Sequence, residues 1–256
     1  MTQDSPEYLA KKARFDRLLT IFGRKPVLEA LETKEAQVER LHLSSRNKKA
    51  PILDQIIHLA NLQNVEIIEH SPQKLSRISK NAKQDQGIAA DIVCPNFMNL
   101  EQLLTLEKPV QRIIALDKIT NPQNLGMIIR SVTASTFDAL VIPEKGCAAL
   151  SPLVIKASAG TLLKAPIVQV NSLAKALKAL KEVGHELYSL RLDAEQSLYT
   201  QTPKNKQIYV LGNETDGVSK EIDTLCNSGI KIPMERNVES LNVAVTASLI
   251  CFQPVN

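Results

Sequence analysis

The sequence predicts an α/β protein with a small N-terminal α/β domain and a larger C-terminal domain built on a parallel sheet. Strand-like and helix-like segments alternate along both halves of the chain, the pattern of sheets covered by helices. The stretch 95–110 runs from Pro95 to just past Pro109 and interrupts this alternation, so we interpret it as a linker. The chain has 256 residues and 44% of them are hydrophobic, which is enough for two modest cores.

The N-terminal half begins with a polar tail, residues 1–20, where helical spacing around Tyr8–Leu19 predicts a loosely docked helix. The domain proper is expected at 21–94. Its strands are expected at 38–44, 65–70 and 87–93, and its helices at 23–32, 52–62 and 71–79. Ser71 and Pro72 fit the N-cap and the first position of the last of these helices.

The C-terminal domain is expected at 111–256, after one short helix within 100–106 of the linker. Its strands are expected at 112–117, 139–142, 166–170, 186–191, 207–212 and 229–232. Its helices are expected at 125–135, 151–158, 172–183, 219–226 and 243–252. A parallel sheet with helices on both faces follows from this order.

Composition and missing motifs exclude several classes of protein. There is no phosphate-binding G-x-x-x-x-G-K-[ST] and no G-x-G-x-x-G after a first strand. The four cysteines show neither metal-ligand nor redox spacing, so no metal is expected. Neither a signal peptide nor an apolar run of membrane-spanning length is found, which predicts a cytoplasmic protein. The net charge of +4 slightly favours a nucleic-acid partner, although the absence of Trp argues against a base-stacking platform.

Asn124 and Arg130 are the most informative polar residues of the segment LDKITNPQNLGMIIRSVTA, which starts at Leu116. Asn124 is at or just before a helix start, where it could simply be an N-cap. Arg130 interrupts an apolar run and needs an anionic partner if it is buried. That partner could be an RNA phosphate or an internal carboxylate such as Asp117 or Glu214.

Two later segments have the composition of ligand-binding loops. In LGNETDGVS, which starts at Leu211, Gly212 ends an apolar strand and would let the backbone approach a ligand closely, or simply make a strand-to-helix turn. In IPMERNVESLNVAVTASL, which starts at Ile232, the residues Ser240, Leu241 and Asn242 open the last helix. Ser240 could be no more than an N-cap, and Leu241 a core residue.

Together the three segments resemble the SpoU/TrmH family of RNA ribose 2′-O-methyltransferases. The resemblance is close from Gln111 to Phe252 and looser from Phe22 to Asp91. It implies a deep trefoil knot in the C-terminal domain, S-adenosylmethionine as cofactor and a homodimer formed through the knotted domains. The catalytic positions it implies are Asn124, Arg130, Glu214, Ser240 and Asn242. The cofactor positions it implies are Leu211, Gly212, Asn213, Ile232, Pro233, Met234 and Leu241.

In this family the arginine at the position of Arg130 is assigned to activation of the ribose 2′-hydroxyl. A guanidinium is almost always protonated, so Arg130 acts as a base only if its site lowers its pKa. Stabilisation of the developing alkoxide charge is the reading we favour. Thr215 and Asp138 stand where relatives often have Gly, so the loop around Thr215 is expected to differ slightly.

The N-terminal domain resembles the RNA substrate-binding domain of the ribosomal RNA branch of the family. The expected phosphate contacts are Arg24, Lys25, Arg46, Lys48 and Lys49. A guanosine of 23S rRNA is the expected target, because a separate substrate domain is present. Transfer RNA is the alternative target, and a non-catalytic RNA-binding assembly protein is the alternative of a different class.

Overall fold

The computed structural model describes residues 17–33, 36–80, 85–108, 111–201, 204–213, 215–236 and 238–253. The chain forms two compact units, Met1–Pro95 and Asn96–Asn256. The division falls at the start of the expected linker. The rest of that stretch belongs to the second unit, where Asn99 caps the short helix α5 (Leu100–Leu104) through a capping box with Gln102.

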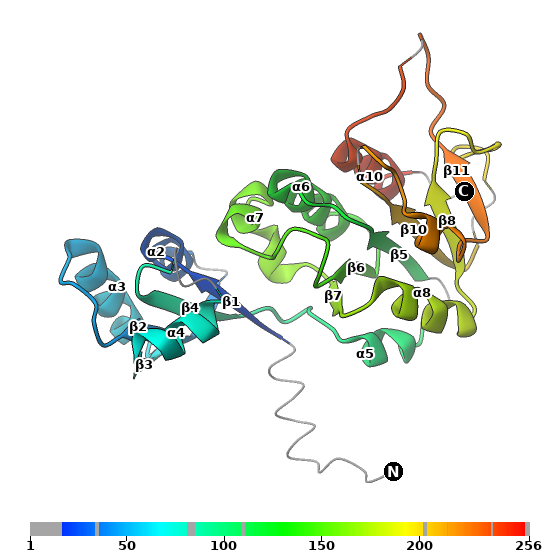
Figure 1. Cartoon of the computed structure of the whole chain (residues 1–256). Helices are drawn as coiled ribbons and strands as arrows, with labels where there is room; N and C mark the ends of the chain where they lie inside the picture. The colour runs from blue at the N-terminus through cyan, green and yellow to red at the C-terminus, as the bar shows by residue number, and fades with distance from the viewer. Residues whose placement is uncertain are drawn as a thin grey trace. The chain divides into compact units, whose positions relative to one another are not determined.

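The first unit contains a four-stranded sheet in the order β1-β4-β2-β3 (Figure 1). Its strands are β1 (Leu18–Phe22), β2 (Gln37–Ser44), β3 (Glu66–His70) and β4 (Ile88–Val93). Its helices are α2 (Arg24–Glu32), α3 (Pro51–Leu62) and α4 (Pro72–Ser79). β2 and β3 are parallel and the other two pairs are antiparallel. The small α/β domain expected at 21–94 thus has mixed strand directions.

Strand β1 corrects the prediction for the start of the chain. Leu18 and Leu19 were expected to end a helix, but they pair with Val93 and Ile92 of β4 in an extended strand. Leu19 and Ile21 are buried while their neighbours are half-buried, which is the period of two of a strand. Tertiary pairing therefore overrides the local helical spacing here. The remainder of the expected helix, up to residue 16, lies outside the described residues.

The second unit contains a seven-stranded sheet in the order β7-β6-β5-β10-β8-β11-β9, and every neighbouring pair is parallel. Its strands are β5 (Gln111–Leu116), β6 (Ala139–Pro143), β7 (Ile167–Val170), β8 (Glu186–Leu190), β9 (Gln196–Ser197), β10 (Lys206–Leu211) and β11 (Ser228–Lys231). This confirms the predicted parallel α/β class. The trefoil knot stays a prediction.

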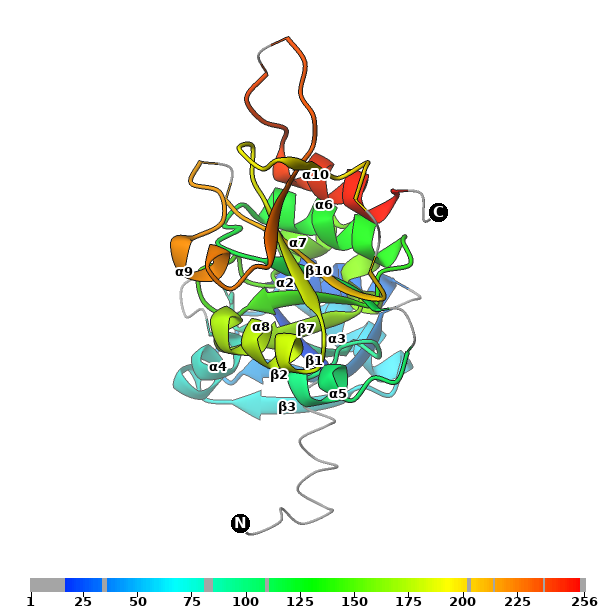
Figure 2. The same cartoon turned by 90° about the vertical axis from the view of Figure 1, so that its right-hand side faces the viewer.

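Helices cover both faces of this sheet (Figure 2). One side carries α6 (Pro122–Thr133), α7 (Pro152–Ala157), the 3-10 turn η1 (Thr161–Lys164) and α10 (Val243–Cys251). The other side carries α5, α8 (Leu173–Glu182) and α9 (Lys220–Asp223). Apolar side chains of α8, such as Leu177 and Leu180, share a core with Ile113 of β5 and Ile208 of β10. No helix in the described part of the chain is both long and apolar enough to cross a membrane.

The strand order determines where a site can form. β10 lies between β5 and β8, although it follows both in the sequence. The loops that follow β5, β8, β10 and β11 therefore emerge at the same edge of the sheet. Ligands of open parallel sheets bind at the carboxyl ends of strands, where the strand order reverses. The three segments singled out from the sequence all lie at this edge.

Candidate functional site

Helix α6 begins three residues earlier than expected, which changes the role of Asn124. Asn121 is the N-cap, because its Oδ1 accepts a hydrogen bond from the backbone N of Gln123 at 2.8 Å, and Pro122 opens the helix. Asn124 is therefore inside the first turn and is not the cap. Its side chain is buried, and its Oδ1 accepts a hydrogen bond from Asn242 Nδ2 at 3.1 Å.

Asn242 belongs to helix α10 and is its N-cap, because its Oδ1 accepts from the backbone N of Ala244 at 2.8 Å. Ser240 was considered as this cap, but it lies two residues earlier and is exposed. Further along the two helices, the hydroxyls of Ser131 and Ser248 are hydrogen-bonded at 2.8 Å. The first and third sequence segments are therefore joined along neighbouring helices.

Arg130 is exposed on α6, so the internal partner that burial would require is not needed. Its position on the helix faces away from the buried side that holds Leu125 and Ile129. Of the carboxylates considered as partners, Asp117 accepts a hydrogen bond from the backbone N of Ser219 at 2.7 Å. Glu214 lies outside the described residues. Within the described part of the chain Arg130 forms no ion pair. Its guanidinium can therefore bind an anionic ligand.

The loop after β10 is closed tightly on itself. The backbone N of Asn213 donates to Gly217 O at 3.1 Å, and the backbone N of Gly217 donates back to Asn213 O at 2.9 Å. A Cβ on Gly212 would lie 2.0 Å from the carbonyl carbon of Gly217 and 2.2 Å from the backbone N of Val218. Gly212 is thus required by the close approach of the chain to itself, which fits the turn that the sequence offered as the alternative to a ligand contact.

The side chain of Asn213 connects this loop to the segment after β5. Its Nδ2 donates to the carbonyl of Lys118 at 3.2 Å, and its Oδ1 accepts from the backbone N of Thr215 at 2.7 Å. Lys118 has a φ of 58°, which is uncommon for a residue other than Gly. Asn213 therefore stabilises the left-handed backbone at Lys118 and holds the first and second sequence segments together.

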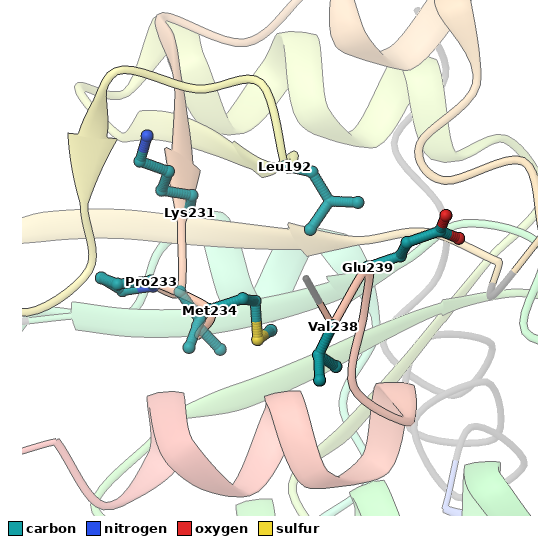
Figure 3. A pocket seen from close by; sticks show the side chains of 7 residues that line it. Leu192, Lys231, Pro233, Met234, Val238 and Glu239 are labelled. Carbon is teal, nitrogen blue, oxygen red and sulfur yellow. The ribbon is translucent and has the colours of Figure 1, made fainter. Parts of the chain in front are cut away.

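A cavity of about 540 Å³ opens between the loops that follow β8, β10 and β11. Its lining includes these residues predicted from the sequence: Leu211, Gly212, Asn213, Ile232, Met234, Ser240 and Leu241. Pro233 instead lines an adjoining hollow of about 490 Å³, where Leu192, Met234 and Val238 are also found (Figure 3). Asn124, Arg130 and Asn242 do not line the cavity, but Leu241 and Val243 on either side of Asn242 do.

One side of this cavity is formed by residues that the sequence pattern did not single out. The residues that follow β8 line it, and they are Arg191, Leu192 and Asp193. They carry no recognisable motif, and their strand is placed beside β10 and β11 only by the tertiary fold. The one available signal was the rule that the carboxyl ends of neighbouring parallel strands lie at the same edge of a sheet, where ligands bind. This rule could have pointed to the residues that follow β8. No group of acidic, His and Cys side chains suited to a metal ion is found among the residues described.

The basic residues predicted to contact RNA come together in the first unit. Lys25, Arg46, Lys48 and Lys49 are exposed. Arg24 differs from them, because its Nη2 donates to Asn47 Oδ1 and to the carbonyl of Lys48, each at 3.4 Å. Asn47 Nδ2 in turn donates to Gly87 O at 2.6 Å. Arg24 thus supports the basic loop 45–49, and the other four cations are exposed to solvent, where they can meet phosphate.

Comparison with known proteins gives the same assignment for both units. Residues 111–252 match the SpoU rRNA Methylase family, and residues 20–98 match the RNA 2′-O ribose methyltransferase substrate-binding family. A 23S rRNA (guanosine-2′-O-)-methyltransferase, RlmB, of Xanthomonas campestris pv. campestris is 31% identical over 92% of this chain and 95% of its own length. An uncharacterized tRNA/rRNA methyltransferase of Mycobacterium leprae is 30% identical over 97% of this chain and 80% of its own length.

A solved structure shares the fold over nearly the whole chain. It is the SpoU methyltransferase AviRb from Streptomyces viridochromogenes in complex with AdoMet, with a TM-score of 0.60 and 21% identity over 97% of this chain and 92% of that one. The joined α6 and α10 segments, the loop at Gly212 and the family matches agree, and we conclude that the chain belongs to the SpoU rRNA methylase family.

Proposed function

We propose that this protein transfers a methyl group from S-adenosylmethionine to a ribose 2′-hydroxyl of RNA, and that its target is a guanosine of 23S rRNA. The hydrogen bond between Asn242 and Asn124 carries the proposal, because it joins α6, which holds Asn124 and Arg130, to the segment whose Leu241 and Val243 line the cavity. The RlmB relative supports the guanosine of 23S rRNA.

The cavity suits the cofactor. Its volume of about 540 Å³ is in the range of small-molecule sites. Leu211, Ile232 and Leu241 offer apolar surface to an adenine, and the ordered backbone at Gly212 and Asn213 offers polar groups nearby. When bound, S-adenosylmethionine supplies an electrophilic methyl group on a sulfonium, so the protein must mainly place the acceptor oxygen in line with it.

Arg130 and Asn124 are the residues that we assign to the acceptor. The exposed guanidinium of Arg130 stabilises the alkoxide charge that develops on the 2′-oxygen, in addition to contacting the adjacent phosphate. Asn124, held by Asn242, orients the hydroxyl. Ser240 at the cavity edge supports this arrangement. Glu214 keeps the catalytic role that its position in the family implies.

We propose that the active form is a homodimer in which a second copy covers α6 and α10. Met127 on α6 and Val245 on α10 are 45% and 42% exposed, so a second copy packed against these helices would remove apolar surface from water. Arg130 lies one turn from Met127 on α6. A dimer formed here would therefore bury the apolar side chains and enclose Arg130 at the edge of the reaction site.

The experiment is methyl transfer from labelled S-adenosylmethionine to total RNA from a strain that lacks this gene, followed by separation of the RNA by size. Label in 23S rRNA, mapped to the ribose of a guanosine, is expected. Label in tRNA instead would reject 23S rRNA as the target in favour of transfer RNA. Cofactor binding without transfer to any RNA or ribosomal particle would contradict the proposed substrate, and the lack of cofactor binding would favour a non-catalytic RNA-binding protein.

A further inference from the structure

Arg191, the first residue after β8, connects three elements around the cavity. Its Nη1 is 3.0 Å from Asp223 Oδ2 at the end of α9. The other oxygen of this carboxylate, Oδ1, accepts a hydrogen bond from Ser189 Oγ at 2.6 Å, and Ser189 is fully buried in β8. Two donors from the end of β8 therefore fix Asp223. Arg191 and Asp223 both line the cavity.

The third element is β11, which passes directly beneath the guanidinium of Arg191. The backbone N of Arg191 donates to Ile230 O at 3.0 Å. A Cβ on Gly229 would lie 2.5 Å from Nε and 2.6 Å from Nη2 of Arg191. The guanidinium thus occupies the space that any side chain at position 229 would need. The bare backbone of Gly229 allows Arg191 to reach Asp223.

We propose that Arg191 is a positioning residue of the cofactor site, which holds the loop after β8 as one wall of the cavity. The proposal rests on the function proposed above, because the ligand is S-adenosylmethionine. Leu192 and Asp193 follow Arg191 and line the same cavity, and Arg191 Nε is 3.7 Å from the Asp193 carboxylate. Fixing Arg191 against Asp223 and Gly229 therefore fixes the two residues that face the ligand.

The ion pair itself contributes little to folding, since the side chain of Arg191 is 40% exposed to solvent. The effect of removing it can therefore be measured on ligand binding without loss of the fold. Gly229 offers a second and independent way to move the guanidinium. Its new Cβ would meet only the far end of a flexible side chain, so Gly229→Ala displaces Arg191 at small cost to stability.

The test compares Arg191→Ala, Gly229→Ala and the double variant in the full-length protein, with Lys178→Ala on the exposed side of α8 as control. Calorimetric titration with S-adenosylmethionine should show a Kd raised about tenfold for Arg191→Ala, the effect of losing one charge-assisted contact. Gly229→Ala should raise Kd in the same direction. The double variant should bind no more weakly than Arg191→Ala alone, because both changes act through one side chain.

Kinetics separate positioning from a general loss of structure. In Arg191→Ala, KM for S-adenosylmethionine should rise while KM for RNA stays unchanged, and kcat should recover at saturating cofactor. Unchanged cofactor affinity in Arg191→Ala, or fully additive losses in the double variant, would overturn the proposal. If the wild-type protein itself did not bind S-adenosylmethionine, the proposed function would fail together with this inference. Binding by the wild type with an unaffected Arg191→Ala would reject the inference alone.

Discussion

The side-chain amide of Asn242 bonds to Asn124 Oδ1 across 118 positions of the chain and at the same time caps α10 through Ala244. One residue thus joins the start of the last helix to the first turn of α6. The two contacts use different atoms, Nδ2 toward Asn124 and Oδ1 toward the backbone of Ala244. Substitutions that keep one contact and remove the other can therefore separate folding from activity.

Asn242→Ser should retain the cap, because Ser is a good N-cap residue, but its hydroxyl is too short to reach Asn124. We expect a smaller loss of stability than in Asn242→Ala, which loses the cap as well, and a clear loss of methyl transfer. Asn242→Ala should lose the activity and also about 1 kcal/mol of stability. Urea unfolding followed by circular dichroism, together with the transfer assay, checks both. Full activity of Asn242→Ser would show that the bond to Asn124 has no part in the reaction.

Arg130→Ala should lower kcat for methyl transfer by roughly 100-fold or more, the effect of losing a charge-stabilising donor at a reaction centre. The residue is exposed and forms no ion pair with the described part of the chain, so stability should change by less than about 0.5 kcal/mol. Cofactor affinity measured by calorimetry should also stay close to that of the wild type. Normal methyl transfer by Arg130→Ala would show that Arg130 has no role in the reaction.

Arg130→Lys distinguishes the two roles considered for the arginine. A lysine retains a positive charge but loses the planar, bidentate donor arrangement. If Arg130 stabilises charge and holds a phosphate, Arg130→Lys should keep partial activity. The pH profile of methyl transfer by this variant should then have the same shape as that of the wild type. A lysine that restored activity only at high pH would indicate that a deprotonated group is needed at this position.

Gly212→Ala should destabilise the loop after β10, because the added methyl group meets backbone atoms of residues 217 and 218 that cannot move aside cheaply. The expected cost is roughly 1 to 3 kcal/mol, as for an overpacked core position. Cofactor binding should weaken as a consequence of this rearrangement. Gly229→Ala is the matched comparison, since its methyl group meets a flexible side chain. Equal thermal midpoints for the two variants would contradict this explanation.

Much of the fold could be predicted from the sequence because local patterns agree with it. Ser71 and Pro72 mark a helix start that the structure confirms. Six of the seven strands of the parallel sheet were also expected within one or two residues, whereas the two-residue strand β9 was not expected. Strand β1 was missed, since its apolar residues follow a segment with helical spacing and only pairing with β4 reveals the strand.

The site was predictable only where a segment carries its own polar signature. Asn124 and Arg130 were found in this way, but their environments stayed open, because a linear pattern does not show that Asn121 is the cap or that Arg130 faces outward. Arg191 was missed altogether. Its importance arises from Asp223 and Gly229, which lie on other elements, and this arrangement exists only after folding.

The basic loop 45–49 should contribute to RNA affinity through phosphate contacts. Lys48→Ala and Lys49→Ala should each weaken RNA binding and reduce the slope of log K against log salt concentration by about 0.7 to 0.9. Cofactor binding should be unchanged. Filter binding of ribosomal RNA at several salt concentrations measures this slope, with Lys178→Ala as the control. A salt slope identical to that of the wild type would exclude phosphate contact by these lysines.

Asn47→Ala tests whether the shape of this loop matters as well as its charge. The side chain of Asn47 donates a hydrogen bond to Gly87 O and accepts one from Arg24. Its removal therefore deletes two contacts that hold the loop, while every lysine is retained. RNA affinity should fall without a large change in the salt slope, because no phosphate contact is deleted. A variant with unchanged RNA affinity would show that the loop needs no fixed conformation.

His70 should make the stability of the protein depend on pH near neutrality. Burial lowers the pKa of His70 below its ordinary value of 6.5, and electrostatic interactions with His42 and Lys74 lower it further. His42 lies between His70 and Asp91, with its Nδ1 2.9 Å from His70 Nε2 and its Nε2 3.0 Å from Asp91 Oδ2. Arg40 also approaches Asp91, at 4.0 Å.

Because the folded state resists protonation of His70, the unfolded state binds the extra proton as the pH falls through about 6.5. The free energy of unfolding should therefore be constant above this value and decrease below it. Urea unfolding at pH 5.5 and 7.5 should show a smaller difference for His70→Gln than for the wild type. A residual difference should remain, since burial also lowers the pKa of His185 in the second unit. His58→Gln, exposed on α3, controls for the substitution itself, and an unchanged difference in His70→Gln would exclude this role.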